Sequence, residues 1–305
     1  MKAFSIYSHV IFCFLIACNT TVAERDDNPD LEFTPSEEFT EYWWTGKAEI
    51  NSYKLEQARY GEIHQGNAVL IFVTEDFSKK KHVKLDNPQQ AGNDAVNVLK
   101  LNFTKKFTTG IYPYSMMMSS FKPVEVSNFP NTFKVTATSQ EWCGHTFTQL
   151  DLEKERYEGY LFSYFESEGS ESQVSLQKEL LEDEIWNTIR LDYNLLPTGN
   201  IEIIPGLLSQ RLLHHDFAVL KANASLLDAE DDQKIYLVEY EKPQRTLKIF
   251  FQSEFPYQIE GWEDSQMIRG KLMTTKAKLN KSLKLDYWNK NQPNDKKYRQ
   301  ELDLE

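Results

Sequence analysis

The sequence has few cysteines, no long apolar run and no surplus of basic residues. Only three of its 305 residues are cysteine. A transmembrane helix needs about 20 predominantly apolar residues, and the continuous run from Val10 to Cys18 is much shorter. These shortages argue against a disulfide-stapled scaffold and against a helix that spans a bilayer.

The charge balance excludes further classes of function. The chain has 34 Lys and Arg against 46 Asp and Glu, a formal net charge of −12. Such a surface repels nucleic acid and anionic headgroups, so we expect no nucleic-acid partner. The sequence also lacks a P-loop, a dinucleotide glycine fingerprint and a Gly-x-Ser-x-Gly elbow. We therefore expect no nucleotide or other cofactor.

The first eighteen residues have the order of a secretory signal that ends in a cysteine. Lys2 supplies a minimal basic region, Val10 to Ala17 is apolar, and Leu15 and Ala17 stand where a lipobox requires an aliphatic and a small residue before Cys18. This order predicts a signal peptide over residues 1–17, a lipid on Cys18 and a polar tether over 18–32. The protein would be anchored to a membrane by its lipid, not inserted into it.

Loss of the signal peptide has two consequences. It removes one positive charge, so the formal net charge of −12 becomes −13. It also removes Cys13, and with Cys18 carrying a lipid only Cys143 is left, so no intramolecular disulfide can form. We expect a protein exported from the cytoplasm to the cell envelope, with the outer membrane favoured over the inner.

Short alternating segments dominate the rest of the chain. Apolar residues alternate with polar ones in stretches such as 96–109, 133–138, 236–240 and 247–251, and turn signals separate them at hairpin-like spacing. No regular alternation of strands with helices appears, which argues against a parallel sheet. The pattern predicts a mainly β, α+β fold: a large curved antiparallel sheet or half-barrel.

One segment is predicted to be an amphipathic helix packed on that sheet. Leu181, Ile185 and Ile189 recur at a spacing of four within residues 176–193, with acidic residues early in the segment and Arg190 late. We expect a single domain over 33–285, with an alternative sub-boundary near 166–175, and an exposed or frayed polar tail over 286–305.

The most distinctive local pair of potentially reactive side chains is Cys143 with His145, within Glu141-Trp142-Cys143-Gly144-His145. They could act as nucleophile and base. With His214 they could instead contribute to a metal site, although zinc needs further ligands. The competing interpretation makes Cys143 a core or turn residue and Gly144 a bulge, so no metal is expected.

A second candidate site would bind an apolar ligand. Methionine suits irregular or ligand-filled cavities, and Tyr112, Tyr114, Met116 and Met118 lie close together in the sequence. These residues either fill the core or line a site for a hydrophobic ligand.

Four stretches resemble a lipoprotein family of the Bacteroidota: Glu41–Glu62, Thr104–Ser115, Gln140–His145 and Pro256–Glu263. Members are often labelled septum formation inhibitor Maf, which would imply a nucleotide pyrophosphatase, but the Ser-Pro-Arg-Arg element of Maf enzymes is absent here. The order of strands around Pro256 also resembles the half-barrel lipoprotein carriers LolA and LolB. That resemblance implies a fold and leaves the function open.

Together these observations predict a membrane-anchored envelope lipoprotein that is not an enzyme and binds an apolar ligand or an envelope protein. Two alternatives stay open. One is an envelope hydrolase that uses Cys143 and His145, and the other is a Maf-type pyrophosphatase that lacks the Maf motif.

Overall fold

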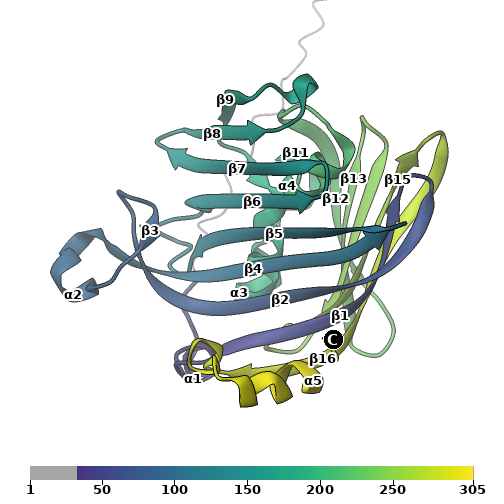
Figure 1. Ribbon diagram of the computed structural model, residues 1–305. Coiled ribbons are helices and arrows are strands. Elements are labelled where there is room, and N and C mark those ends of the chain that lie inside the picture. Colours follow the sequence, from purple (N-terminus) through teal and green to yellow (C-terminus); the bar gives the residue numbers. More distant parts are fainter. Residues whose placement is uncertain (1–32, 305) are drawn as a thin grey trace, which may run out of the picture. The chain divides into compact units, whose positions relative to one another are not determined.

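The computed structural model describes residues 33–304, which all belong to one compact unit. The predicted signal peptide, the lipidation site Cys18 and the tether lie outside the described residues. Most of the described chain is in strands of one curved sheet (Figure 1). The strands are β1 (Ala48–Arg59), β2 (Glu62–Ser78), β3 (Val83–Lys84), β4 (Ala95–Thr109), β5 (Tyr112–Pro123), β6 (Lys134–Glu141), β7 (Gly144–Glu153), β8 (Arg156–Ser163), β9 (Glu171–Gln177), β10 (Leu180–Leu181), β11 (Gly199–Ile204), β12 (Leu220–Asp228), β13 (Gln233–Tyr240), β14 (Arg245–Gln252), β15 (Ile259–Ile268) and β16 (Lys271–Leu285).

Short helices accompany the sheet. The α-helices are α1 (Glu37–Trp43), α2 (Pro88–Ala91), α3 (Glu182–Asp192), α4 (Leu207–Leu213) and α5 (Lys297–Glu301). The 3₁₀ helices are η1 (Gly92–Asp94), η2 (Glu166–Glu168), η3 (Tyr193–Leu195), η4 (Tyr287–Asn289) and η5 (Pro293–Lys296).

The sheet has 16 strands, ordered β10-β11-β12-β13-β14-β15-β16-β1-β2-β4-β5-β6-β7-β8-β9, with β3 paired to β2. Every neighbouring pair is antiparallel except β10 and β11. The first and last long strands, β1 and β16, meet in the middle of the sheet. The predicted fold class, a large curved antiparallel sheet with few helices, is confirmed.

The strands end on two opposite sides of the sheet, the Ile111 end and the Phe33 end. At the Ile111 end, β1 turns into β2, β4 into β5, β6 into β7 and β15 into β16. The described chain begins at the opposite, Phe33 end, where the Phe33 amide donates to Ser127 Oγ (3.0 Å) in the connection between β5 and β6. The β4–β5 turn lies at the right of Figure 1 and α2 at the left.

Helix α3 runs along the concave side of the sheet between these two ends. Its first residue, Glu182, pairs with Arg245 at the start of β14, and near its other end Arg190 donates to the Pro256 carbonyl (2.8 Å). The Trp186 ring packs against Phe103 and Trp262, with centroids 5.2 and 5.4 Å away. The helix and aromatic side chains therefore fill the concave side.

The predicted helix began too early. Leu176 belongs to β9, and Leu180 and Leu181 form the short strand β10, so the helix starts at Glu182. The spacing of Leu181, Ile185 and Ile189 was correct, and all three side chains are buried. Residues 166–175, the alternative sub-boundary, contain η2 and most of β9, which pairs with β8.

Buried ion pairs fix α3 to widely separated strands. Besides the pair at Glu182, the Lys122 ammonium on β5 lies 3.0 Å from Glu184, and Arg190 forms a bidentate pair with Glu49 on β1. Isolated buried charges are costly, whereas paired and hydrogen-bonded ones are tolerated. The acidic start of α3 is therefore an interior feature and not a solvated face.

The tail predicted to be exposed or frayed instead packs on the outer face of the sheet. Leu302 and Leu304 are buried in a cluster with Ile50, Val69 and Val73. The Ser52 hydroxyl on β1 donates to the Leu302 carbonyl (2.6 Å). The expectation of an exposed tail was wrong for these residues, because two leucines in a polar segment were enough to cover the apolar outer side of β1 and β2.

Candidate functional site

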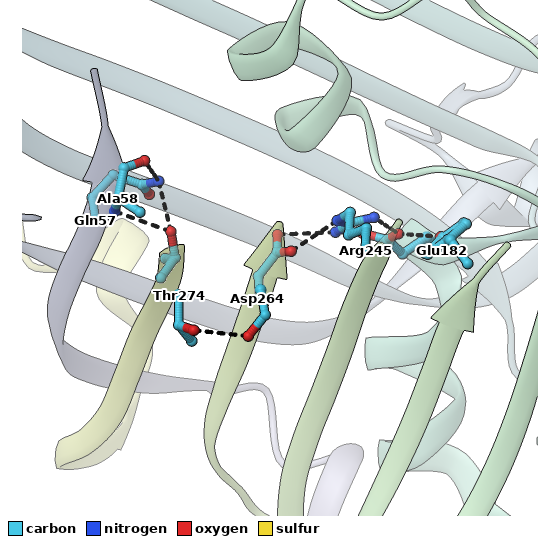
Figure 2. A network of polar contacts seen from close by, with 9 residues as sticks. Gln57, Ala58, Glu182, Arg245, Asp264 and Thr274 are labelled. Atoms are coloured by element: carbon cyan, nitrogen blue, oxygen red, sulfur yellow. Dashed lines mark hydrogen bonds and ion pairs between the residues drawn. The ribbon is translucent and has the colours of Figure 1, made fainter. Parts of the chain in front are cut away.

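A buried polar network lies at the Ile111 end, where α3 begins. Arg245 donates from Nε to Asp264 Oδ1 (2.8 Å) and from Nη2 to Asp264 Oδ2 (3.0 Å) and Glu182 Oε1 (2.8 Å). Its Nη1 and the Tyr240 hydroxyl donate to Glu182 Oε2. Figure 2 shows Arg245 between the two carboxylates. Burial raises the pKa of Glu182, but the charge and hydrogen bonds of Arg245 outweigh this effect and leave the pKa below its usual range.

Two further ionisable side chains adjoin the network. Asp183 Oδ2 accepts the Leu207 amide at the start of α4 (2.9 Å), and burial raises the pKa of Asp183 to about 7. Lys105 is also buried, and its ammonium has no hydrogen bond or ion pair with any residue in the described range. Burial lowers the pKa of Lys105. Both residues line a cavity of about 30 Å³, enough space for an ordered water.

Gly206, just before α4, lets the backbone approach this network. A Cβ atom at Gly206 would lie 2.5 Å from Glu182 Oε1 and 3.2 Å from Asp183 Oδ1. The absence of a side chain therefore allows α4 to begin directly over the two acids. This close approach also places the Leu207 amide within reach of Asp183.

The raised pKa of Asp183 predicts a pH-dependent stability. In the unfolded chain the group ionises near its ordinary pKa of 3.8, but in the folded chain only near 7. Between these values the unfolded state gains from ionisation and the folded state does not, so this group lowers the free energy of unfolding as pH rises from about 4 to 7. The shift corresponds to a loss on the order of 4 kcal/mol.

Asp183→Asn, which keeps the oxygen that accepts the Leu207 amide, should remove this loss. Urea unfolding at pH 4, 5, 6, 7 and 8 should show the variant gaining stability over the native chain up to pH 7, with a constant difference above it. Asp86→Asn, at an exposed aspartate between β3 and α2, serves as the control for the general effect of removing an acid. Parallel pH profiles for the Asp183 variant and the native chain would contradict the prediction.

A larger cleft opens beside the network. It has a volume of about 350 Å³ and shares Ser209 and Arg245 with the small cavity. Its wall is formed by α4, the loop that follows it and the turn between β13 and β14. Most of the side chains that line the cleft are apolar or uncharged, namely Pro205, Ser209, Gln210, Leu213, Ala218, Leu220, Tyr240 and Pro243, and they are joined by His214, His215, Asp216 and Arg245.

The cation and one of the imidazoles in this cleft carry no uncompensated charge, whereas Asp216 is exposed and forms no ion pair within residues 33–304. Four of the five N–H groups of Arg245 are directed at Glu182 and Asp264, so this cation is already compensated. Burial lowers the pKa of His215, which leaves this imidazole neutral at pH 7. The arrangement suits an uncharged, mainly apolar ligand better than an anion or a cation.

Cys143 and His145 do not form a nucleophile–base pair. Trp142 and Cys143 are the two turn residues between Glu141 and Gly144, and no bulge occurs there. The Cys143 amide donates to Glu141 Oε2 (2.7 Å), and a hydrogen bond from the thiol to Glu141 raises the pKa of Cys143. Within residues 33–304 no hydrogen bond joins Cys143 to His145, which is exposed. A thiol of raised pKa is a poor nucleophile at neutral pH.

His214 is the residue that ends α4, and within the described residues it forms no hydrogen bond with Cys143 or His145. Its Nδ1 is 2.6 Å from Glu168 Oε1 and 3.2 Å from Arg211 Nη1. No group of three or more His, Cys, Asp or Glu side chains in the described part of the chain is arranged to hold a metal ion. The alternative in which Cys143, His145 and His214 contribute to a metal site therefore has no geometric support.

The proposed ligand-lining residues of β5 belong mainly to the core. Met116 and Met118 are buried in the central cluster. Tyr114 is buried as well, stacked on Phe107 with centroids 4.7 Å apart, and its hydroxyl lies 2.8 Å from that of Tyr60. Tyr112 is only partly buried. None of the four lines the 350 Å³ cleft.

The sequence contains one signal for the network, on β4. Leu101, Phe103 and Phe107 occupy one side of β4, and Lys105 falls on that same side by alternation. A lysine on the apolar side of a strand indicates a buried partner or a site. Arg245, Glu182, Asp183 and Asp264 gave no such signal, because each stands beside turns or charges typical of an exposed surface.

The chain matches no model of a known protein family, and no curated protein matches it either. The resemblance to Bacteroidota lipoproteins and to half-barrel carriers therefore stays a prediction. No helix in the described residues has the length and apolar character needed to cross a membrane.

Proposed function

We propose that the chain is a lipid-anchored envelope protein that binds an uncharged, mainly apolar small molecule in the cleft at the Ile111 end. The 350 Å³ cleft beside α4 carries this proposal, because its volume falls in the range of small-molecule sites, most of its lining is apolar or uncharged, and its guanidinium is compensated. The anchor is inferred from Cys18 and its preceding residues, which lie outside the described part of the chain.

The placement of the ligand differs from what a hollow half-barrel would suggest. The concave side is occupied by α3, and the rings of Trp186 and Trp262 pack against each other there. An apolar molecule would therefore enter between α4 and the β13–β14 turn, at the Ile111 end of the strands. The small cavity behind Arg245 and Ser209 extends the cleft inward and would accept a single polar group or a water.

Binding of a neutral fluorescent probe tests this function. Residues 32–305 contain the whole described core, so this fragment can be titrated with N-phenyl-1-naphthylamine. We expect saturable binding of one probe molecule. Ala218→Trp should fill the cleft and weaken probe binding at least tenfold.

Ala229→Trp is the matched control. Ala229 is partly buried, as Ala218 is, but it lies in the β12–β13 turn at the Phe33 end. The control variant should bind the probe as the native fragment does. Equal binding by the Ala218 variant, with both variants folded by circular dichroism, would refute the cleft as the binding site, and the absence of saturable binding would refute the proposed function.

A further inference from the structure

The most exposed large apolar side chains of the described residues gather at one end of the sheet. Ile111 is 81 % exposed, Tyr164 72 %, Trp142 68 % and Leu272 64 %. Ile111 is in the β4–β5 turn, Trp142 in the β6–β7 turn, Tyr164 just after β8, and Leu272 is the second residue of β16. All four connections are at the Ile111 end.

This composition is unusual for turns. Two-residue hairpin turns favour Gly, Asn and Asp, which tolerate a left-handed backbone and are well hydrated. Single exposed apolar residues are common on protein surfaces and need no explanation. Here, however, the four highest exposures among large apolar residues of the described range occur at turns of one end of the sheet, which points to a function for that end.

Neighbouring side chains hold these turns in place. The Trp142 ring lies 6.3 Å from that of Tyr112. The Tyr164 ring covers Gly144, where a Cβ atom would approach ring atoms to 2.7 Å. Both aromatic side chains are thus supported from below while their outer faces remain in water. Ordering them on a partner would cost little conformational entropy.

A lipid bilayer fits this surface better than a protein. The apolar side chains sit on separate hairpins, so each can insert into a lipid interface independently, whereas a protein partner would need one contiguous complementary patch. Trp and Tyr are side chains that favour the membrane interface. Arg269 and Lys271 adjoin Leu272, and long basic side chains can extend toward headgroups while their stems stay in apolar surroundings.

We propose that the Ile111 end docks onto the surface of a lipid bilayer and exchanges the apolar ligand of the cleft with it. The exchange part rests on the proposed function, since the cleft beside α4 opens at this same end. The docking part stands on the exposed turns alone. The first described residue, Phe33, lies at the opposite end beside Ser127, so the described start of the domain does not cover the Ile111 end.

Vesicle sedimentation tests docking without the lipid anchor. The fragment 32–305 should co-sediment with phosphatidylcholine vesicles in the absence of any probe, and binding should persist in high salt because it depends on apolar insertion. The variant Ile111→Ser/Trp142→Ser/Tyr164→Ser/Leu272→Ser should bind at least tenfold more weakly. Brominated lipid should quench the native fragment more than a Trp142→Phe variant.

The opposite end supplies the matched control. Val83, Leu227 and Trp288 are also exposed apolar residues, at 45 %, 42 % and 45 %, and all three lie toward the Phe33 end. Val83→Ser/Leu227→Ser/Trp288→Ser should leave vesicle binding unchanged. Equal loss in the two variants, or a native fragment that does not sediment with vesicles, would overturn the proposal.

The Ala218→Trp variant separates the two proposals. It should lose the probe but bind vesicles as the native fragment does. A native fragment that binds the probe but not vesicles would overturn docking alone. A native fragment that binds vesicles but not the probe would refute only the ligand function.

Discussion

Arg245→Met should lower the free energy of unfolding by about 3–5 kcal/mol, because it leaves Glu182 and Asp264 buried without their common partner. Both carboxylates accept two hydrogen bonds from this one guanidinium. Methionine keeps much of the packing volume, so the loss reflects the uncompensated charges more than a cavity. Urea unfolding of residues 32–305 at pH 7 measures it.

Two further variants isolate the cause. Lys248→Met, on the same strand but pointing away from the network, should change stability by no more than about 0.5 kcal/mol. Adding Glu182→Gln and Asp264→Asn to Arg245→Met should restore part of the loss, since the remaining groups are then neutral. A loss below about 1 kcal/mol for Arg245→Met alone would show that the network does not stabilise the fold as proposed.

Cys18→Ser should abolish lipid attachment entirely, since on the proposed function this thiol accepts the diacylglycerol. In cells labelled with radioactive palmitate, the native full-length chain should carry the label and the Cys18 variant should carry none. Multiple acyl chains give stable anchoring, whereas a single chain gives only marginal, reversible binding. The native chain should therefore fractionate with membranes through its lipid.

Cys13 offers the matched control for this experiment. It is the other cysteine of the amino-terminal segment, five residues before Cys18, and it would leave with the signal peptide. Cys13→Ser should keep the label in full. Label on the Cys18 variant, or its absence from the native chain, would contradict the lipoprotein interpretation, as would a mature chain that does not begin at residue 18.

Much of the fold could be predicted because strand periodicity is a local property. Alternation across residues 96–109 fixed which side of β4 is buried, and the same alternation places Lys105 inside. The helix was recognised from Ile185 and Ile189, but its start was not, because Leu176 and Leu180 suit a strand as well as a helix.

The candidate site was harder to predict because its residues are far apart in the sequence. Glu182, Arg245 and Asp264 belong to α3, β14 and β15, and each looks like an ordinary surface charge in its local context. The motif that did stand out locally, Cys143 with His145, lies at a solvent-exposed hairpin turn, where the thiol hydrogen-bonds to the Glu141 carboxylate and not to the imidazole. A short motif is visible in the sequence whether or not it forms a site, whereas side chains that only the fold brings together leave no such motif.

The amino-acid order alone was sufficient for the β class, the antiparallel pairing of successive strands and the prediction of a lipidated start, because each depends on neighbours within a few residues. Tertiary structure decided that α3 fills the concave side, that the acids at its start are buried, and that a cleft and four apolar turns share one end. These features depend on curvature of the sheet and on contacts between residues more than sixty positions apart, such as Glu182 with Arg245 and Glu49 with Arg190. The local sequence pattern does not indicate which distant residues come into contact.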